Sequence, residues 1–315
     1  MTEREDLLEE LRPTSFAIAY RMLGSVVEAE DVVQEALVRV HETLEGGERL
    51  ASPQAFVATV TTRLAINELR SARARRESYV GEWLPEPIIT DGRDDPADHA
   101  EIADSLSLAL LVVLESLTPE QRAVLLLHDV FDYEYAEVAA IVDKSEAATR
   151  QLASRARRQV GERRPRFQTT SEHREEMGRR FVAAAERGDL AGLEALLAAD
   201  VELTGDGGGK VPAAVRRLRG RSRVAKAMVA WLRRAREIPG ARFLPTEVNG
   251  GPGALFVDGE GRLISVAAFE VAGDQIASIN SIVNPDKLRH LGPVVNYAEL
   301  MQEVRAARGD STGAP

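Results

Sequence analysis

The chain has 315 residues, no cysteine, five histidines and a formal net charge of -10. At about 150 residues per domain, this length predicts two or three domains. The lack of cysteine excludes disulfides and cysteine metal sites, and the histidines lie too far apart in sequence to form local ligand pairs, so we expect no metal, no cofactor and no enzyme activity. The amino terminus carries acids where a signal peptide needs bases, and the longest apolar run is far below the roughly 18 residues of a membrane span. We therefore expect a soluble, cytoplasmic chain that makes no contact with membranes.

The charges are distributed in alternating blocks. Residues 1–41 have a net charge of -5, residues 63–76 hold five arginines and one acid, residues 79–104 have a net charge of -7, and residues 144–166 have a net charge of +6. A run of charge is often only a solvated helix face. Two separate arginine-rich segments on predicted helices favour contact with nucleic acid instead.

The first predicted domain, residues 1–78, is all-helical. Apolar residues recur at helical spacing up to Gly24, and Ser25 with Glu28 predicts a capping box for the next helix. That helix has an apolar stripe on one side and acids on the other. Pro53 at a first helical position opens a further helix, whose arginines lie opposite its apolar residues.

Two stretches of this domain resemble region 2 of the extracytoplasmic-function (ECF) sigma factors of RNA polymerase, namely 16–25 (FAIAYRMLGS) and 29–36 (AEDVVQEA). The resemblance implies that the acidic helix binds the β′ clamp helices of core polymerase through Asp31, Gln34 and Glu35. It also implies that the basic helix reads and melts the -10 promoter element, while the loop 42–53 receives a flipped base. The residues of the basic helix expected at the DNA are Arg63, Asn67, Arg70, Arg73, Arg75 and Arg76.

Residues 79–103 read as a linker, because prolines interrupt any helix and acids favour solvent. Trp83 is an unusual residue for such a segment, since a tryptophan is costly to leave in water. The run Trp83, Leu84, Pro85 resembles a linker signature of the ECF sigma factors that carry a fused SnoaL-like domain. It implies contact between the linker and that domain. The alternative is that Trp83 packs on the first domain.

The second predicted domain, residues 104–165, has the plan of a helix-turn-helix. Thr118, Pro119 and Gln121 predict a capped helix start. A short helix over 135–142 is followed by a turn and by a long basic helix over 146–160. A generic helix-turn-helix or a protein-binding bundle is the alternative interpretation.

This domain resembles sigma region 4, which contacts the β flap of the polymerase and the -35 promoter element. Spacing of i, i+1, i+4 and i+5 places four polar residues on one face of the basic helix, where arginine can pair with guanine or phosphate and glutamine with adenine. Ala148, Leu152 and Ala156 are expected to face inward. The residues expected at the -35 element are Arg150, Gln151, Ser154, Arg155, Arg157 and Arg158.

The third predicted domain, residues 170–288, is α+β, with helices followed by an antiparallel meander of strands. Helices are expected at 172–186, 189–198 and 222–236, and strands at 201–204, 242–248, 254–257, 263–271 and 276–283. The strand at 263–271 is apolar on both faces, so the sheet is covered twice or curls around a pocket. Residues 289–315 form a carboxy-terminal tail, expected to be disordered from Arg305 onward.

The order of these elements resembles the SnoaL-like, nuclear-transport-factor-2-like cone. Enzymes of this fold place acids or histidines in the cavity, and here only Asp206 and Asp274 are candidates, both in glycine-rich turns. The resemblance to the fused subgroup assigns regulatory contacts with the sigma domains to two loops. These contain Asp206, Lys210, Asn284, Pro285, Asp286, Lys287 and Leu288.

The sequence therefore predicts a multi-domain protein of two all-α sigma domains and one α+β cone. The function implied is an alternative sigma factor that binds core RNA polymerase and promoter DNA and is regulated in cis by its third domain. The alternative is a ligand sensor or enzyme tethered to DNA. That alternative predicts a filled or polar-lined cavity and turnover or binding of a small molecule, and a dry, apolar, closed cavity argues against it.

Overall fold

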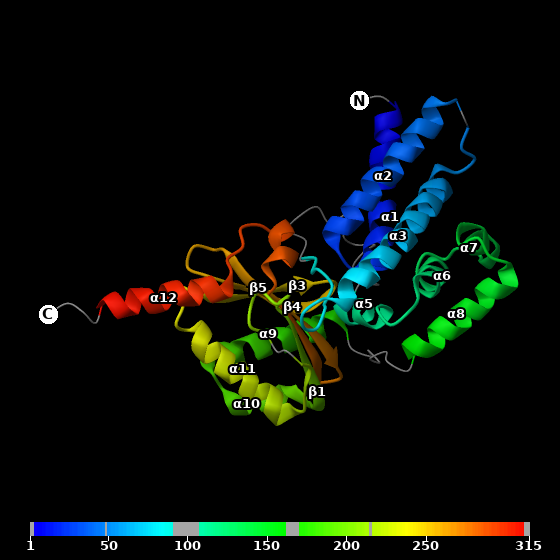
Figure 1. Ribbon diagram of the computed structural model, residues 1–315. Coiled ribbons are helices and arrows are strands. Elements are labelled where there is room, and N and C mark those ends of the chain that lie inside the picture. Colours follow the sequence, from blue (N-terminus) through cyan, green and yellow to red (C-terminus); the bar gives the residue numbers. More distant parts are fainter. Residues whose placement is uncertain (1–2, 48, 91–106, 162–169, 214–215, 312–315) are drawn as a thin grey trace. The chain divides into compact units, whose positions relative to one another are not determined.

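The computed structural model describes residues 3–47, 49–90, 107–161, 170–213 and 216–311, without the side chains of 3, 73–77, 171, 305 and 307–311. The chain divides into two compact units. The first contains residues 1–78 and 100–164, and the second contains residues 79–99 and 165–315. The segment 79–90, which follows the first helical domain in sequence, thus packs as part of the second unit (Figure 1).

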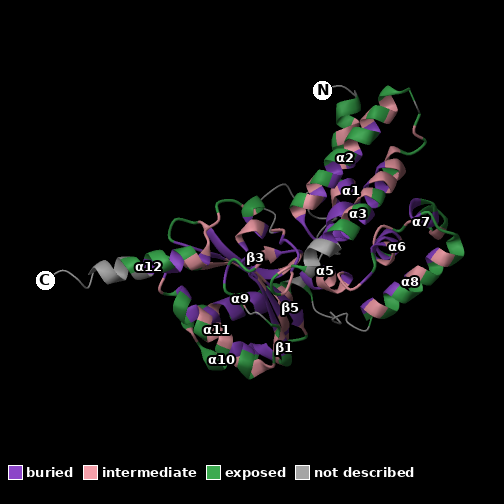
Figure 2. Ribbon diagram, viewed as in Figure 1, coloured by how far each residue is buried: buried purple, intermediate pink, exposed green. Residues whose placement is uncertain are grey.

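The first three helices form a bundle. They are α1 (Glu3–Leu23), α2 (Val26–Glu45) and α3 (Pro53–Glu77). Gly24 has a left-handed φ of 68°, which confirms the predicted break, and the Ser25 hydroxyl accepts a hydrogen bond from the Glu28 backbone, which is the Ser25 half of the predicted capping box. The apolar stripe of α2 is buried against its neighbours while the opposite side is exposed (Figure 2).

Four helices complete the first unit. They are α5 (Leu108–Leu114), α6 (Pro119–Asp129), α7 (Tyr135–Ile141) and α8 (Glu146–Gly161). The predicted capping box of Thr118 and Gln121 is present at the start of α6. Asp143 in the turn between α7 and α8 has a φ of 54°, a left-handed conformation that Asp tolerates better than most residues. The helix-turn-helix prediction is confirmed.

The second unit is built on a six-stranded sheet in the order β2-β1-β6-β5-β4-β3. Helices α9 (Ser171–Arg187), α10 (Leu190–Leu196) and α11 (Arg221–Ala235) pack against it, as Figure 1 shows. The strands are β1 (Leu197–Asp206), β2 (Leu218–Arg219), β3 (Arg242–Val248), β4 (Gly251–Val257), β5 (Leu263–Ala272) and β6 (Gln275–Ile282).

The meander prediction is right for the last four strands, which pair antiparallel in sequence order. Asn249 and Gly250, with φ values of 52° and 70°, make the tight turn between β3 and β4. Strand β5 is buried on both faces, as its composition predicts.

Two predictions for this unit are wrong. The helix expected at 189–198 ends at Leu196, and β1 begins at Leu197 rather than at Val201. In addition, β1 pairs with β6 in parallel, so the sheet is mixed. A parallel pair joins segments far apart in sequence, and local alternation gives no sign of it.

The carboxy-terminal segment is more ordered than its composition suggests. Two short 3-10 helices, η1 (Pro285–Lys287) and η2 (Arg289–Leu291), precede α12 (Tyr297–Ser311). Tyr297, Leu300 and Met301 are buried in an apolar cluster that includes Phe256. The prediction of disorder from Arg305 is therefore wrong as far as Ser311, because an apolar face at the start of α12 holds the helix on the domain.

Candidate functional site

The acidic face of α2 presents the three residues expected to bind polymerase. Asp31, Gln34 and Glu35 are exposed, and the residues between and after them, Val32, Val33 and Ala36, are buried. Glu35 is paired with Arg39 one turn later at 2.5 Å. A helix that keeps two carboxylates and an amide on one solvent-facing side can dock on a basic or polar partner surface.

The arginine row of α3 lies on one face, with Arg63, Asn67 and Arg70 all exposed. Arg63 donates from Nε to the Ile141 carbonyl at 3.0 Å and from Nη2 to the Ala140 carbonyl at 2.9 Å. These carbonyls are at the carboxyl end of α7, where the helix dipole favours a cation. Arg63 is thus held by the helix-turn-helix domain.

Arg70 is held in the same way, because its guanidinium is 2.6 Å from the Glu120 carboxylate in the first turn of α6. Two of the arginines expected at the -10 element therefore contact the second helical domain in this conformation. Arg73, Arg75 and Arg76 lie further along α3, and their side chains are outside the described residues.

Helix α8 exposes all six residues expected at the -35 element. Its buried residues are Thr149, Ala153, Ala156 and Val160, so Ala148 and Leu152, which were expected to face inward, lie only at the edge of the buried stripe. The exposed residues are Arg150, Gln151, Ser154, Arg155, Arg157 and Arg158.

Two of these arginines are engaged within their own domain. The Arg150 guanidinium lies 4.4 Å from the centre of the Tyr135 ring and pairs with Glu146. Arg157 pairs with Asp129 through both carboxylate oxygens, which raises the pKa of its guanidinium. Both side chains are oriented by these contacts, yet both stay accessible to a phosphate.

Two buried arginines join the helical domains and are missing from the residues predicted from sequence. Arg122 on α6 is 2% exposed and donates to the Met22 carbonyl of α1 at 2.6 Å and to Glu115 at 2.6 Å. Arg21 on α1 is also 2% exposed, with its guanidinium 5.1 Å from the centre of the Phe131 ring, and burial lowers its pKa to about 10. Sequence patterns place arginine in solvent, so only the tertiary contacts reveal this role.

A buried polar cluster fastens the linker to the third domain. Asp206 ends β1 and is fully buried, and it accepts hydrogen bonds from the Tyr79 hydroxyl at 2.5 Å, the Leu84 backbone at 2.8 Å and Lys287 Nζ at 2.7 Å. Lys287 Nζ also donates to the Leu84 carbonyl and lies 4.1 Å from the centre of the Trp83 ring. Burial and the bond to Asp206 raise the pKa of Tyr79.

The other residues of the two predicted loops lie around this cluster. Asn284 donates to the Tyr79 hydroxyl at 2.9 Å, and Lys210 pairs with Asp286. Pro85 and Leu288 are buried and Pro285 is half-buried at the start of η1. The structure thus brings the three motifs together, and Asp206 binds the linker rather than a substrate.

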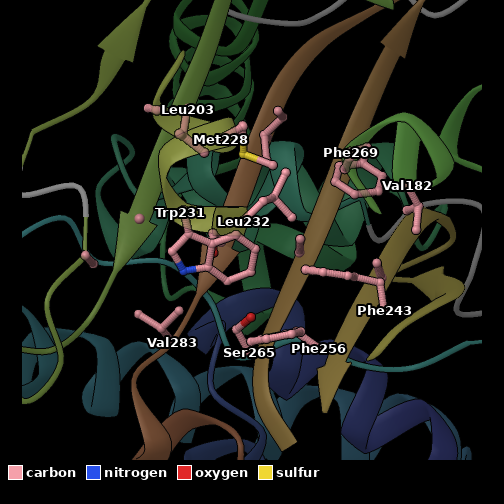
Figure 3. Close-up of a pocket in the computed structure, with 18 of the residues that line it drawn as sticks. Val182, Leu203, Met228, Trp231, Leu232, Phe243, Phe256, Ser265, Phe269 and Val283 are labelled. Atoms are coloured by element: carbon pink, nitrogen blue, oxygen red, sulfur yellow. The ribbon is translucent and has the colours of Figure 1, made fainter. Parts of the chain in front are cut away.

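The third domain encloses a cavity of about 310 Å³ (Figure 3). Aromatic rings dominate its wall, with Trp231, Phe243 and Phe256 packed on one another at centroid distances of 4.6–5.6 Å. Neither Asp206 nor Asp274 lines it, and its described lining contains no Asp, Glu or His. The described lining therefore lacks the acids and histidines that enzymes of this fold place in the cavity.

Two sigma-factor domain models match the chain: Sigma-70 region 2 over residues 7–75 and Sigma-70 region 4 over residues 107–160. They correspond to α1–α3 and α5–α8, the bundle with the arginine row and the helix-turn-helix domain. The fold and these matches define a sigma factor with an added α+β domain. Sigma factors bind core RNA polymerase and promoter DNA and are initiation factors, not enzymes.

The chain belongs to the ECF family of RNA polymerase sigma factors. It is 40% identical over 292 residues to the ECF RNA polymerase sigma factor SigJ of Mycobacterium tuberculosis, covering 89% of this chain and 91% of that protein. The crystal structure of M. tuberculosis SigJ matches with a TM-score of 0.73 and 36% identity, covering 90% of this chain and 98% of that one. The probable sigma factor SigI of the same species is 34% identical over 175 residues, covering 55% of this chain and 59% of SigI. None of the helices in the described part of the chain combines the length and apolarity needed to cross a bilayer.

Proposed function

We propose that the helical faces described above divide the work of initiation. Asp31, Gln34 and Glu35 bind the β′ clamp helices of core polymerase, and the second helical domain contacts the β flap. The arginine row of α3 binds the -10 element and α8 binds the -35 element, with arginines on phosphates and on guanine edges. This role places the protein in the cytoplasm, where the polymerase works.

The third domain controls this activity in cis through the linker. The linker joins the two helical domains in sequence, so a domain that holds it limits how far they can separate. The observation that carries this proposal is the buried bonding of Asp206 and Lys287 to Tyr79 and Leu84. Buried, charge-assisted hydrogen bonds of this kind are strong enough to hold a segment in place.

A second candidate role, small-molecule sensing, is favoured by the enclosed cavity. The cavity itself is expected for a sensor, but its mostly apolar lining differs from the polar lining expected from the sequence. A ligand that fits this lining would bind through shape and apolar contact rather than through reaction.

In vitro transcription of the Lys287→Gln variant tests the linker proposal. We expect the run-off transcript made with core polymerase to change several-fold from that of the wild type, because the variant removes the charge that joins Leu84 to Asp206. Lys226→Gln, an exposed lysine on α11, is the matched control and should leave the transcript unchanged. Equal transcript from wild type and Lys287→Gln would show that the linker contact does not regulate the protein.

A further inference from the structure

The cavity of the third domain has the size of a small two-ring molecule. Its volume of about 310 Å³ is roughly twice that of a 150 Å³ cavity that holds benzene. This volume lies at the lower end of the range for ligand pockets. Arg234 lines the cavity and is itself exposed, so the cavity reaches the surface beside this residue.

The walls favour a flat apolar body. Phe243 and Phe256 stack at 4.6 Å with an angle of 19° between their planes, and the Trp231 ring meets both edge-on. Across the cavity, Phe181 meets Phe269 at 5.1 Å and 65°. Figure 3 shows Trp231, Phe256 and Phe269 around one shared space. Aromatic rings arranged this way offer both faces and edges to a planar guest.

One polar group within these walls lacks a protein partner. Ser265 is 2% exposed and lines the cavity on β5, between Phe256 of the neighbouring strand and Ala267 two residues further along. Among the described residues its hydroxyl makes no hydrogen bond, and Figure 3 shows Ser265 among the side chains that line the cavity. Because Ser265 lines the cavity, a ligand oxygen placed here would form a hydrogen bond with its hydroxyl.

The charges around the cavity oppose an ionised ligand. Arg234 is the only ionisable residue in the described lining, and its exposed guanidinium is solvated. The remaining polar side chains there, Ser265, Ser281 and Trp231, are neutral. An ion placed among these groups would lose its hydration without a buried counter-charge.

We propose that this cavity binds an uncharged, planar two-ring molecule that carries one hydroxyl or carbonyl oxygen, with that oxygen hydrogen-bonded to Ser265. The inference rests on the sensing role proposed above and names its class of ligand. The ligand contacts the same aromatic cluster, through Phe256, on which α12 packs. Occupancy therefore stabilises the domain as a whole.

Calorimetry of the full chain with three matched probes tests the proposal. The probes are 2-naphthol, naphthalene and 2-naphthoate, which share the two-ring body and differ in the oxygen and the charge. We expect 2-naphthol to bind about fivefold more tightly than naphthalene, the effect of one hydrogen bond, and at least about tenfold more tightly than 2-naphthoate. If the carboxylate of 2-naphthoate pairs with Arg234, 2-naphthoate would bind more tightly than 2-naphthol, and this result would overturn the proposal.

Two variants and one control locate the binding. Ser265→Ala should remove the advantage of 2-naphthol over naphthalene, while Ala267→Leu fills the cavity and should weaken both at least tenfold. Ala230→Leu, on the exposed side of α11, should change neither affinity. Thermal unfolding without probe verifies that each variant is folded. Failure of all three probes to bind, or binding that survives Ala267→Leu, overturns the proposal.

This experiment contains no polymerase, so its failure would leave the proposed transcription role standing. Conversely, loss of run-off activity with intact naphthol binding would count against the transcription role alone.

Discussion

Asp206 shows how a residue of ambiguous sequence context acquires a role from its contacts. Its position in a glycine-rich turn suggests that it only stabilises the turn, whereas enzymes of the cone fold suggest a catalytic role. The structure buries it completely and surrounds it with donors from the linker and from Lys287. These contacts make it the acceptor on which the attachment of the linker depends.

We predict that Asp206→Asn lowers the free energy of unfolding by about 3–5 kcal/mol, the cost of leaving a buried cation without its partner. Urea unfolding measures the change. Asp274→Asn is the control, since its side chain is 90% exposed and should have little effect. Similar free energies of unfolding for the two variants would contradict the role of the buried pair.

We propose that the arginines of α8 separate into a group that reads bases and a group that binds the DNA backbone. Arg155 belongs to the face expected on base edges, and Arg158 lies one turn of helix nearer the carboxyl end. Both are exposed. Their positions on the helix therefore predict that substitution of Arg155 and substitution of Arg158 affect the preference for promoter DNA over random DNA differently.

With core polymerase present, Arg155→Ala should weaken binding to a promoter fragment by about 1–3 kcal/mol and binding to random DNA much less. Arg158→Ala should weaken both alike and reduce the slope of log affinity against log salt by about 1. Fluorescence anisotropy at several salt concentrations measures both effects. Equal losses on both DNAs for Arg155→Ala would remove it from base recognition.

Among the elements, helices were predicted best because their ends depend on local chemistry. Ser25 and Thr118 begin helices through hydrogen bonds to backbone groups three residues away, which a reader of the sequence can foresee. The strand β1 was predicted too short, because its pairing with β6 depends on residues far along the chain. The buried Arg122 escaped prediction for the same reason, since its partner is the Met22 carbonyl of another helix.

Helix α12 is the element whose removal should be felt most in the third domain. Its buried side chains are Tyr297, Leu300, Met301 and Val304. Full burial of one large apolar side chain stabilises a fold by about 1.5–3 kcal/mol. A chain ending after Leu288 should therefore unfold at a markedly lower temperature and expose Phe256 to an apolar dye. A chain ending after Ser311 serves as the control. An unchanged unfolding temperature would show that α12 does not cover the apolar cluster.

At the scale of the whole molecule, the net charge of -10 is a sum that includes two arginine-rich helices, α3 and α8. Some arginines of these helices contact other residues of the protein. Arg63 and Arg70 are exposed residues that contact the helix-turn-helix domain. The region 2 and region 4 resemblances predicted the arginines but not these contacts, which depend on how the two helical domains pack together in one unit.

Because Arg70 is exposed and Glu120 is only half-buried, salt should loosen the contact between the helical domains. The cysteine-free chain allows dyes on Val38→Cys and Lys144→Cys, both exposed positions. Energy transfer between the dyes should fall as salt rises from about 0.05 to 0.5 M, and Arg70→Gln should flatten this dependence. Energy transfer that does not change with salt would contradict an electrostatic contribution to the contact between the two helical domains.

Run-off transcription with purified core polymerase tests the central claim most directly, using the full chain and a chain that ends after Val160 on one candidate promoter. We predict a discrete transcript that appears only when the protein is added to core polymerase and whose amount changes when the third domain is removed. No discrete transcript from either chain would contradict a role in initiation, and equal amounts from both would contradict regulation by the third domain.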